Sequence, residues 1–521
     1  MSRVLLHTFI LSVILWTTGN AQAESIKRSA CVAESLPVLP DVRINAVTEE
    51  AAPLPHCKVE GVIGAEIGFE LLLPDVWSGK FVMGGSGGFA GSFFNAAQDM
   101  GALEKGYATV STDTGHKGHA MDASWALNHL ERLENFGHQA VHRTAVNAKA
   151  LIKAYYGRAI TRNYFLGCSR GGGQALMEAQ RYPEDFEGIV AMSPAYNWTH
   201  EQGARWIHIA QRMYPDPAQI KTPVIGPDAV KLIGDAVMAQ CDELDGIKDG
   251  MLNDPRQCKF DVSSLACGIA ASGDCLSPQQ LDAAKAIYDD FEIDGQLLPG
   301  TPIGVEWPGS PLGWEMWLTG GYEPGEVIDF HEGVDHTLQA PSVPNGTWAF
   351  ATGIFRYFLH NDPNWSYAGY DFKDFPEKAA RVARSLNADN PDLSAFRARG
   401  GKLIIDNGWM DGSMSAHGTI KYYEDVLKHD STARNDVRLF LRPGVAHCRF
   451  GPGPDTTDYL DAIDEWVESG KAPEQLPAYY RGPDLQPSRE GRILCAYPNA
   501  VTYNGSGNTR DPSSFHCVNP D

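Results

Sequence analysis

The stretch YFLGCSRGGG at residues 164–173 decides how this chain folds. A short apolar run ends in a glycine-rich turn that contains Ser169, and residues compatible with a helix follow from Gln174 onward. The pattern Gly167-x-Ser169-x-Gly171 fits a nucleophile elbow, in which a strained strand-to-helix turn exposes a serine above a parallel sheet. A glycine-rich turn without any catalytic role is the alternative, and the pattern alone does not choose between the two.

A second pattern mirrors the first one. Cys168 directly precedes Ser169, and far along the chain Cys448 directly follows His447. A disulfide between these cysteines would hold their Cα atoms roughly 5.5 Å apart and bring Ser169 within reach of His447. A serine hydroxyl is a weak nucleophile until a base takes its proton, and a neutral imidazole is the usual base. The two pairs together predict a catalytic Ser–His combination.

An acid that orients the imidazole is expected between the serine and the histidine in sequence, which is the order in α/β-hydrolases. Residues 402–405 read as a strand, and the loop that follows carries Asp406 and Asp411. Asp411, deeper in the turn and directly before Gly412, is the favoured candidate. Asp406, at the end of the strand, is the alternative.

Residues 84–91, GGSGGFAG, follow a short apolar run and are typical of an oxyanion-binding loop. Such a glycine-rich backbone lets N–H groups approach a developing negative charge closely. We expect the N–H of Arg170 to be one donor and that of Gly87 or Gly88 to be the other. A phosphate-binding loop is a poor alternative because no Gly-Lys-Ser/Thr follows.

Strand-like and helix-like segments alternate from about residue 80 to residue 195 and again from residue 402, which is the rhythm of a mostly parallel sheet. The region between them is rich in Trp, Pro and Gly. The predicted fold class is therefore α/β: an α/β-hydrolase core from residues 24–196 and 400–521, with a large inserted lid domain at 197–399. Most aromatic residues of this lid are expected in its own core, and a minority should line the pocket.

These motifs together resemble the tannase and feruloyl esterase family of secreted α/β-hydrolases. The resemblance covers about residues 31–517 and rests on the Cys-Ser and His-Cys motifs, the glycine-rich segment, the Gly-x-x-Asp loop at 408–411, and the stretch QRYPEDFEGIVA at 180–191. The chain departs from the common family pattern at Arg170, Gly173 and Asn407, where Thr, Arg and His are frequent. We expect the Arg170 side chain to form a salt bridge to an acid of the core or lid; a contact with an anionic or phenolic part of the substrate is the alternative.

The resemblance implies a serine carboxylesterase that forms an acyl-enzyme through Ser169, His447 and Asp411. Its substrates would be small esters of phenolic aromatic acids, with feruloyl esterase activity as the first choice. Tannase activity on gallate esters and hydrolysis of terephthalate monoesters are the alternatives. A calcium-dependent binding protein on an inactive hydrolase scaffold is the alternative from a different class.

Ten cysteines fit an oxidising compartment and permit five disulfides, whose connectivity spacing alone does not determine. Proximity and the resemblance imply the pairs Cys31–Cys57, Cys168–Cys448, Cys241–Cys258, Cys267–Cys275 and Cys495–Cys517.

The acidic stretch CDELDGIKDGMLND at 241–254 lies between two of these cysteines and reads from its residues alone as a solvated acidic turn. It lacks the EF-hand spacing, although oxygen-rich loops also suit Ca²⁺. The resemblance implies a structural calcium site here, with the side chains of Asp242, Asp245 and Asp249 and the backbone carbonyls of Ile247 and Met251 as ligands.

Residues 1–23 read as a secretory signal peptide, with Arg3, an apolar run over 4–16 and the small-residue cleavage site Ala21-Gln22-Ala23. We therefore expect a secreted or periplasmic protein. Beyond this segment, the sequence holds no apolar run as long as a membrane span. The formal charge of -22 argues against nucleic acid or an anionic membrane as a partner.

Overall fold

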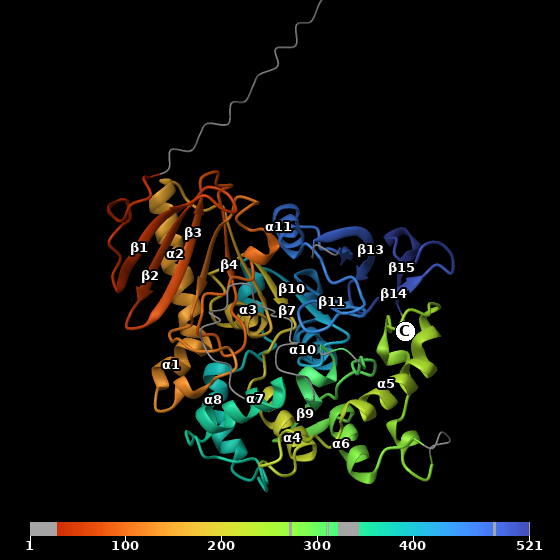
Figure 1. Ribbon diagram of the computed structural model, residues 1–521. Helices are drawn as coiled ribbons and strands as arrows, with labels where there is room; N and C mark the ends of the chain where they lie inside the picture. Colours follow the sequence, from red (N-terminus) through yellow and green to blue (C-terminus); the bar gives the residue numbers. More distant parts are fainter. Residues whose placement is uncertain are drawn as a thin grey trace, which may run out of the picture.

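The computed structural model describes residues 29–269, 274–308, 310, 312–320, 343–482 and 486–519. The predicted signal peptide lies outside this part of the chain. The fold is of the α/β class, as the sequence predicts, and it is built around one large sheet (Figure 1).

Within the described residues, nine strands form this sheet in the order β1-β2-β3-β5-β4-β6-β7-β10-β11. From β5 onward the neighbours are parallel, whereas the pairs β1/β2, β2/β3 and β3/β5 are antiparallel. The antiparallel edge was not predicted from the sequence. The strands are β1 (Val42–Glu50), β2 (His56–Ile63), β3 (Ile67–Pro74), β4 (Lys80–Gly84), β5 (Ala108–Thr112), β6 (Arg162–Cys168), β7 (Gly188–Met192), β10 (Lys402–Gly408) and β11 (Val437–Arg442).

Helices cover both faces of the parallel part of the sheet. Successive side chains of a strand point to opposite faces, so Phe165 packs on one face while Tyr164 and Leu166 pack on the other. Burial on both sides explains why these strands are apolar throughout instead of alternating. One face is covered by α2 (Ala140–Tyr156), α3 (Arg170–Arg181) and α10 (Ala416–His429), and the other by α11 (Tyr459–Ser469).

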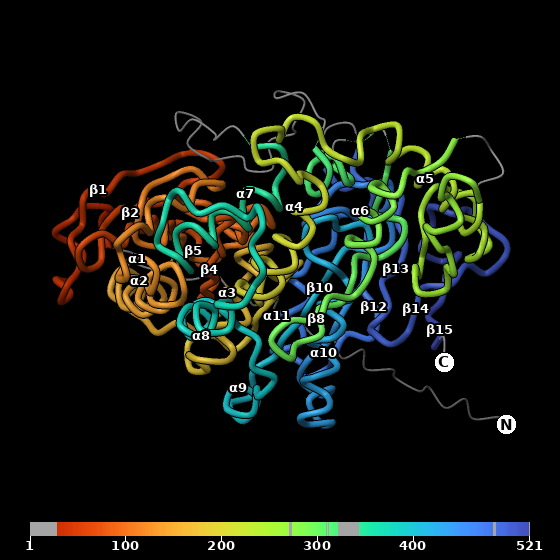
Figure 2. Tube along the Cα trace, turned by 90° about the horizontal axis from the view of Figure 1, so that it is seen from below, coloured from red at the N-terminus to blue at the C-terminus, as the bar shows by residue number. Residues whose placement is uncertain are grey.

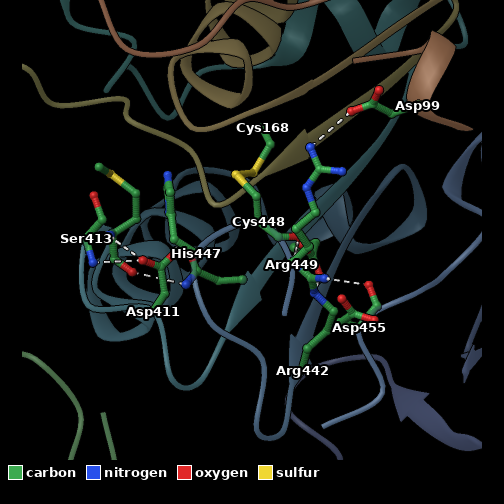
Figure 3. Close-up of a disulfide and its surroundings, with 12 residues drawn as sticks. Asp99, Cys168, Asp411, Ser413, Arg442, His447, Cys448, Arg449 and Asp455 are labelled. Carbon is green, nitrogen blue, oxygen red and sulfur yellow. Dashed lines mark hydrogen bonds and ion pairs between the residues drawn. A yellow bond between two sulfur atoms is a disulfide. The ribbon is translucent and has the colours of Figure 1, made fainter. Parts of the chain in front are cut away.

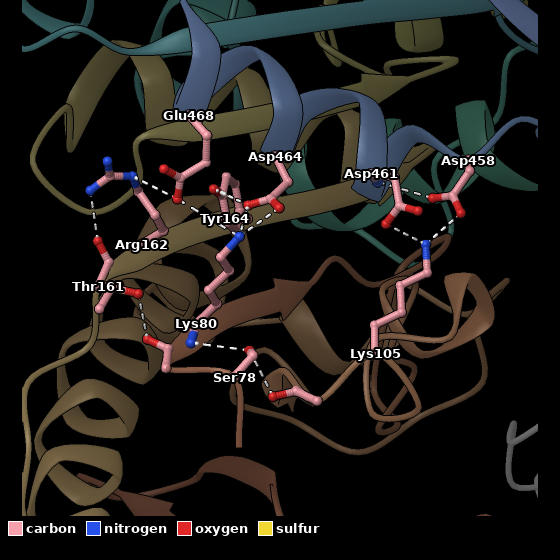
Figure 4. Close-up of polar contacts among 12 residues, drawn as sticks. Ser78, Lys80, Lys105, Thr161, Arg162, Tyr164, Asp458, Asp461, Asp464 and Glu468 are labelled. Atoms are coloured by element: carbon pink, nitrogen blue, oxygen red, sulfur yellow. Dashed lines mark hydrogen bonds and ion pairs between the residues drawn. The ribbon is translucent and has the colours of Figure 1, made fainter. Parts of the chain in front are cut away.

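Polar contacts fasten α11 to its face of the sheet (Figure 4). Asp464 of α11 accepts hydrogen bonds from the Lys80 ammonium at 2.6 Å and from the Tyr164 hydroxyl at 2.5 Å. Farther along the same face, Lys105 pairs with Asp458 and with Asp461 at 2.7 Å. The Asp464 contacts join α11 to β4 and β6, which lead into the glycine-rich loop and to Ser169.

The segment between β7 and β10 adds no described strand to the large sheet. It contains α4 (Trp206–Met213), α5 (Pro227–Cys241), α6 (Pro278–Tyr288), α7 (Gly346–Gly353), α8 (Phe375–Leu386), α9 (Ser394–Ala398) and the hairpin β8 (Phe291–Ile293) and β9 (Gln296–Leu298). Helix α4 packs against α6 and α7, and most of these elements lie at one end of the strands, below the sheet in the view of Figure 1 (Figures 1 and 2). This segment has its own large apolar cluster.

Four short π-helical segments occur in the described chain: η4 (Asn135–Gln139), η5 (His200–Arg205), η9 (Glu315–Thr319) and η10 (Ile354–Leu359). Segment η4 connects α1 (Leu130–Glu134) to α2. The other three segments lie between β7 and β10. Such wide turns are rare and occur frequently at functional sites.

All ten cysteines lie in the described part of the chain and form the five predicted disulfides. The last of these, Cys495–Cys517, joins two small antiparallel pairs near the C-terminus. These pairs consist of β12 (Gln475–Arg481) with β13 (Pro487–Cys495) and of β14 (Ala500–Tyr503) with β15 (Phe515–Val518).

Candidate active site

Ser169 occupies the turn between β6 and α3, with φ +60° and ψ −119°. A residue other than glycine rarely adopts a positive φ, so this backbone is strained in the way the elbow requires. Glycines make the turn possible because backbones meet there. A Cβ on Gly167 would lie 2.4 Å from the carbonyl carbon of Gly171, and a Cβ on Gly173 would lie 2.0 Å from the Ala195 oxygen.

The Cys168–Cys448 disulfide joins the elbow to the loop that follows β11 (Figure 3). Its Cα atoms are 5.9 Å apart, although 280 positions separate the two cysteines in the sequence. Ser169 and His447 are the direct neighbours of these cysteines in the sequence. The bridge therefore brings the segment that carries Ser169 close to the segment that carries His447. Among the described residues, no hydrogen bond links the Ser169 hydroxyl to the imidazole. Such contacts are often long before a substrate binds.

His447 Nδ1 forms a 2.8 Å hydrogen bond with Asp411 Oδ2, and the Asp411 side chain is completely buried (Figure 3). The other carboxylate oxygen accepts the backbone N–H groups of Ser413 at 2.8 Å and Met414 at 2.9 Å. The carboxylate is therefore fixed by its own loop. With Nδ1 held as a donor, Nε2 is left as the acceptor that a general base needs.

Asp406, the alternative acid, is engaged elsewhere. Its carboxylate forms a 2.6 Å ion pair with Arg442 and accepts the Tyr459 hydroxyl at 2.5 Å. Arg442 also donates to the backbone carbonyl of Cys448 at 3.1 Å. Asp406 thus acts on the histidine loop only indirectly, by holding the guanidinium that supports Cys448.

The glycine-rich loop lies beside the elbow. In the described structure, the backbone N–H groups of Gly87, Gly88 and Arg170 have no acceptor, and Gly88 lines the pocket above Ser169. Gly88 has φ +54°, and a Cβ there would lie 2.3 Å from the Ala120 oxygen. Arg170 is the first residue of α3, so its N–H has no intrahelical partner. All three are free to donate to an oxyanion.

One positioning residue was missed by sequence reasoning. Gln174 of α3 accepts the backbone N–H of Ser86 at 3.0 Å and donates to the Ser86 hydroxyl at 2.9 Å. It ties the glycine-rich loop to the nucleophile helix. Its position one helical turn after the elbow was the available signal.

The family model for tannase and feruloyl esterase matches residues 50–518. The chain belongs to this family. An uncharacterised esterase of Xanthomonas campestris pv. campestris is 32% identical over 99% of this chain and 95% of the relative. Mono(2-hydroxyethyl) terephthalate hydrolase of Piscinibacter sakaiensis is 31% identical, over 91% of this chain and 86% of that protein.

Among solved structures, feruloyl esterase B from Aspergillus oryzae superposes with a TM-score of 0.77 at 25% identity and covers 92% of this chain and 98% of its own. The present protein is thus a carboxylic ester hydrolase with an α/β-hydrolase-like fold, as the sequence predicts.

The Arg170 side chain of this family member forms no ion pair with an acid in the described structure, so the expected salt bridge is not seen there. The other expectation, a contact with an anionic or phenolic part of the substrate, stays a prediction. Its Nη2 atom donates to the backbone carbonyls of Phe136 and of Gly137 (2.9 Å) in η4, and the guanidinium lies 4.3 Å from the Phe136 ring centre. Burial lowers the pKa of Arg170 to about 9.

This arrangement limits what Arg170 can bind. A guanidinium binds a carboxylate in the two-point geometry through two adjacent nitrogens, either Nη1 and Nη2 or Nε and Nη2. Both arrangements include Nη2. Because Nη2 is already bonded to two carbonyls, Arg170 cannot hold a carboxylate in the planar two-point geometry. Its free Nε and Nη1 atoms remain available as single donors.

The pocket above Ser169 has an aromatic lining. Trp198, Trp206 and Phe350 come from the segment between β7 and β10, and Met414 comes from the Asp411 loop. Trp317, in η9, contacts His447 edge-on at 4.9 Å between ring centres. The prediction that some lid aromatics line the pocket is met by these residues, which sequence alone could not single out from the many that pack in the segment's own core.

The acidic loop at 241–254 is folded around its carboxylates. Asp242 accepts the backbone N–H groups of Asp249 and Gly250, and Asp245 accepts those of Ile247 and Asn253. Arg492, from β13, pairs with Asp249.

The donors of this loop are of the type that suits calcium. One Asp249 oxygen is buried without a hydrogen-bond partner, and oxygen donors of this kind suit Ca²⁺. In the residues that the structure describes, however, no three His, Cys, Asp or Glu side chains are grouped so that they could hold a metal ion. The predicted ligands Asp242, Asp245, Asp249, Ile247 and Met251 remain a prediction.

Proposed function

We propose that this esterase hydrolyses esters of phenolic aromatic acids, with feruloyl-type esters as its first substrates. The observation that carries the proposal is the Asp411–His447 hydrogen bond, held against the Ser169 elbow by the Cys168–Cys448 bridge. The aromatic side chains beside Ser169 are of the kind that packs against the flat ring of such an acyl group.

In the acylation step, Ser169 Oγ attacks the ester carbonyl carbon while His447 Nε2 takes the hydroxyl proton. Asp411 keeps the imidazole in the required tautomer and stabilises the imidazolium. The carbonyl oxygen becomes an oxyanion, which the N–H groups of Arg170 and of Gly87 or Gly88 stabilise. The C–O bond to the alcohol then breaks, the alkoxide takes the proton from His447, and an acyl-serine ester remains.

Deacylation repeats these steps with water as the nucleophile. His447 takes a proton from the water as its oxygen attacks the acyl carbon, and the same backbone N–H groups hold the second oxyanion. The bond to Ser169 Oγ breaks, the serine regains its proton from the imidazole, and the aromatic acid leaves. No oxidant or organic cofactor takes part in either step.

Gallate esters and terephthalate monoesters remain alternative substrates. The occupied Nη2 of Arg170 disfavours recognition of a free carboxylate by that residue, so a terephthalate monoester would need another group to hold it. The assembled acid–base pair argues against a calcium-dependent binding protein on an inactive scaffold.

A panel of methyl ferulate, methyl gallate and mono(2-hydroxyethyl) terephthalate tests the proposal, with Ser169→Ala as the inactive control. We expect the highest kcat/KM on methyl ferulate and a loss of at least 10³-fold in the Ser169→Ala variant. Equal residual rates in the variant and the native enzyme would remove Ser169 from the mechanism. Absence of hydrolysis across the panel would refute the proposal.

Structural calcium is part of the same proposal. Supporting it are the carboxylate-rich loop closed by the Cys241–Cys258 bridge and the unpartnered buried oxygen of Asp249. The loop belongs to the segment between β7 and β10, away from Ser169 in sequence, so a bound ion would stabilise that segment without entering the reaction.

We also place the enzyme outside the cytoplasm, in the periplasm or the medium. Five disulfides persist in oxidising compartments and are rare in reducing ones. The signal-like first 23 residues agree with export. Among the described residues, none of the helices combines the length and apolar character needed to cross a bilayer.

A further inference from the structure

The acid loop, residues 408–414, carries Asp411 between β10 and α10. Its first half is tied to the segment that leads to His447. The backbone N–H groups of Trp409 and Met410 donate to backbone carbonyls of that segment at 2.9 and 3.0 Å. These two bonds fix where the loop begins. The place of the Asp411 carboxylate depends as well on how the loop returns to α10.

Asn407, one of the positions at which the chain departs from the common family pattern, lies directly before this loop. Its side-chain Nδ2 donates to the carbonyls at both ends of the loop, to Gly408 at 3.0 Å and to Met414 at 3.1 Å. Its Oδ1 accepts the hydroxyl of Thr419, in α10, at 2.8 Å. Asn407 is fully buried and Thr419 is 1% exposed. One side chain therefore joins the start of the loop, its end and the helix that follows.

This network leaves one orientation for the Asn407 amide. A backbone carbonyl only accepts hydrogen bonds, so the NH₂ end has to face Gly408 and Met414, and the oxygen end has to face the Thr419 hydroxyl. The reverse orientation would place the amide oxygen against two carbonyl oxygens in a buried site, which is costly. The amide is thus fixed, and it holds the two ends of the acid loop at a set separation.

Met414 connects this amide to the acid. The Met414 carbonyl accepts from Asn407, and the Met414 N–H donates to Asp411 Oδ1 at 2.9 Å. The other oxygen of the same carboxylate, Oδ2, forms the 2.8 Å hydrogen bond with His447 Nδ1. A shift of the Met414 backbone would therefore move the carboxylate that orients the imidazole.

We propose that Asn407 is a positioning residue for Asp411: it fixes the return of the acid loop and, through it, the direction of the Asp411–His447 hydrogen bond. The inference rests on the catalytic roles proposed for Asp411 and His447. Asn407 does not line the pocket above Ser169, so it acts through the loop and not on the substrate.

A double-mutant cycle tests this role, because the effect of a positioning residue disappears once the group that it positions is removed. Asn407→Ala is compared with the native enzyme, and Asp411→Asn/Asn407→Ala with Asp411→Asn. The substrate is 4-nitrophenyl acetate, a small activated ester that makes the result independent of the acyl preference. Each kcat is divided by the folded fraction measured by tryptophan fluorescence.

We expect Asn407→Ala to lower kcat roughly ten- to hundredfold in the native background, as for a displacement of about 1 Å between reacting groups. In the Asp411→Asn background the same change should lower kcat less than about threefold, because no carboxylate is left to displace. A general loosening of the fold would lower kcat by the same factor in both backgrounds.

The matched control is Asn163→Ala. The Asn163 amide also donates within the fold, to the Glu187 carboxylate at 3.1 Å, but it lies at the start of β6, at the end of the strands opposite to Ser169. This variant should keep kcat within about twofold of the native value. If Asn407→Ala does not fold, Thr419→Val replaces it in the cycle. That change keeps the shape of the side chain, removes the hydroxyl bonded to Asn407, and should lower kcat about two- to tenfold in the native background alone.

The outcomes separate this inference from the proposed function. Equal losses of kcat in the two backgrounds, or a native kcat in the folded Asn407→Ala enzyme, would overturn the positioning role and leave the esterase mechanism intact. A native kcat in Asp411→Asn would overturn the proposed mechanism, and the inference with it.

Discussion

The Cys168–Cys448 bridge should contribute to turnover as well as to stability. The double variant Cys168→Ala/Cys448→Ala removes the closure of a loop of 280 positions. The chain-entropy relation gives a loss of about 5.6 kcal/mol in the free energy of unfolding, as an upper value. That loss is comparable to the whole stability of many domains, so the variant should be assayed at low temperature and without denaturant.

The expected effect on turnover follows from the remaining contacts of the histidine loop. Arg442 still holds the Cys448 carbonyl at 3.1 Å, and Phe450 N still donates to Asp455 at 2.7 Å, so the loop keeps its shape. Its attachment to the elbow is lost, however, and a displacement of about 1 Å between reacting groups can cost 10²-fold. We expect kcat on methyl ferulate to fall roughly ten- to hundredfold, with a smaller change in KM.

The assay counts active sites by titration with a chromogenic phosphonate and measures unfolding in urea separately. The control is Cys267→Ala/Cys275→Ala, which opens a loop of 8 positions and should cost about 2.5 kcal/mol of stability without changing kcat. A double variant of Cys168 and Cys448 with native kcat per titrated site would refute the positioning role. An equal loss of kcat in both double variants would show that the effect is general loosening.

The remaining predictions concern single residues. Asp411→Asn should lower kcat by about 10³- to 10⁴-fold with little change in the urea midpoint, whereas Asp406→Asn should cost about 3–5 kcal/mol of stability and less than tenfold in kcat; the reverse pattern would exchange their roles. Arg170→Thr should reduce kcat/KM equally for methyl ferulate and for chlorogenate, because Nη2 already donates to two backbone carbonyls and is not free to bind the chlorogenate carboxylate. A loss confined to chlorogenate would instead indicate that Arg170 binds the carboxylate of the substrate. Removal of calcium with a chelator, or Asp245→Ala, should lower the melting temperature and leave kcat of the folded enzyme unchanged; a loss of turnover at full foldedness would place the metal in catalysis. Burial, and after it the neighbouring carboxylate of Asp185, raises the pKa of Glu178 well above its ordinary value of 4.5. Its stabilising contribution is complete below pH 4.5 and is lost as the pH rises through the folded-state pKa, so the stability of Glu178→Gln relative to the native enzyme should grow as the pH rises above 4.5; a difference independent of pH would contradict this.

The parallel half of the fold could be predicted because its signals are local. The strands Ala108–Thr112 and Gly188–Met192 and the helix Ala140–Tyr156 lie where apolar runs and helical residues indicate them. The antiparallel edge formed by β1, β2 and β3 was missed. The pairs β1/β2 and β2/β3 are local hairpins, and only the pair β3/β5 joins segments distant in sequence, to which no short motif points.

The roles of charged side chains were the least predictable feature. From sequence, Arg170 stands one residue from the nucleophile, and a partner of opposite charge is the natural expectation. The wide π turn of η4 presents two backbone carbonyls to it instead, and the irregular turn geometry is set by packing against neighbouring helices. Arg442 and Gln174 act through backbone groups of loops distant in sequence, which leave no spacing pattern.

By itself, the sequence determined the elbow, the cysteine pair that brings Ser169 to His447, and the order of the acid and base loops. Each of these features can be recognised from a few adjacent residues: the glycines around Ser169, the cysteines next to Ser169 and His447, and the polar residues that follow each apolar strand. Only the tertiary structure decided that Asp411 and not Asp406 meets the imidazole, and that Trp198, Trp206 and Phe350 line the pocket. Which partner a buried polar group finds depends on the packing of segments hundreds of residues apart, and that choice exists only once the chain has folded.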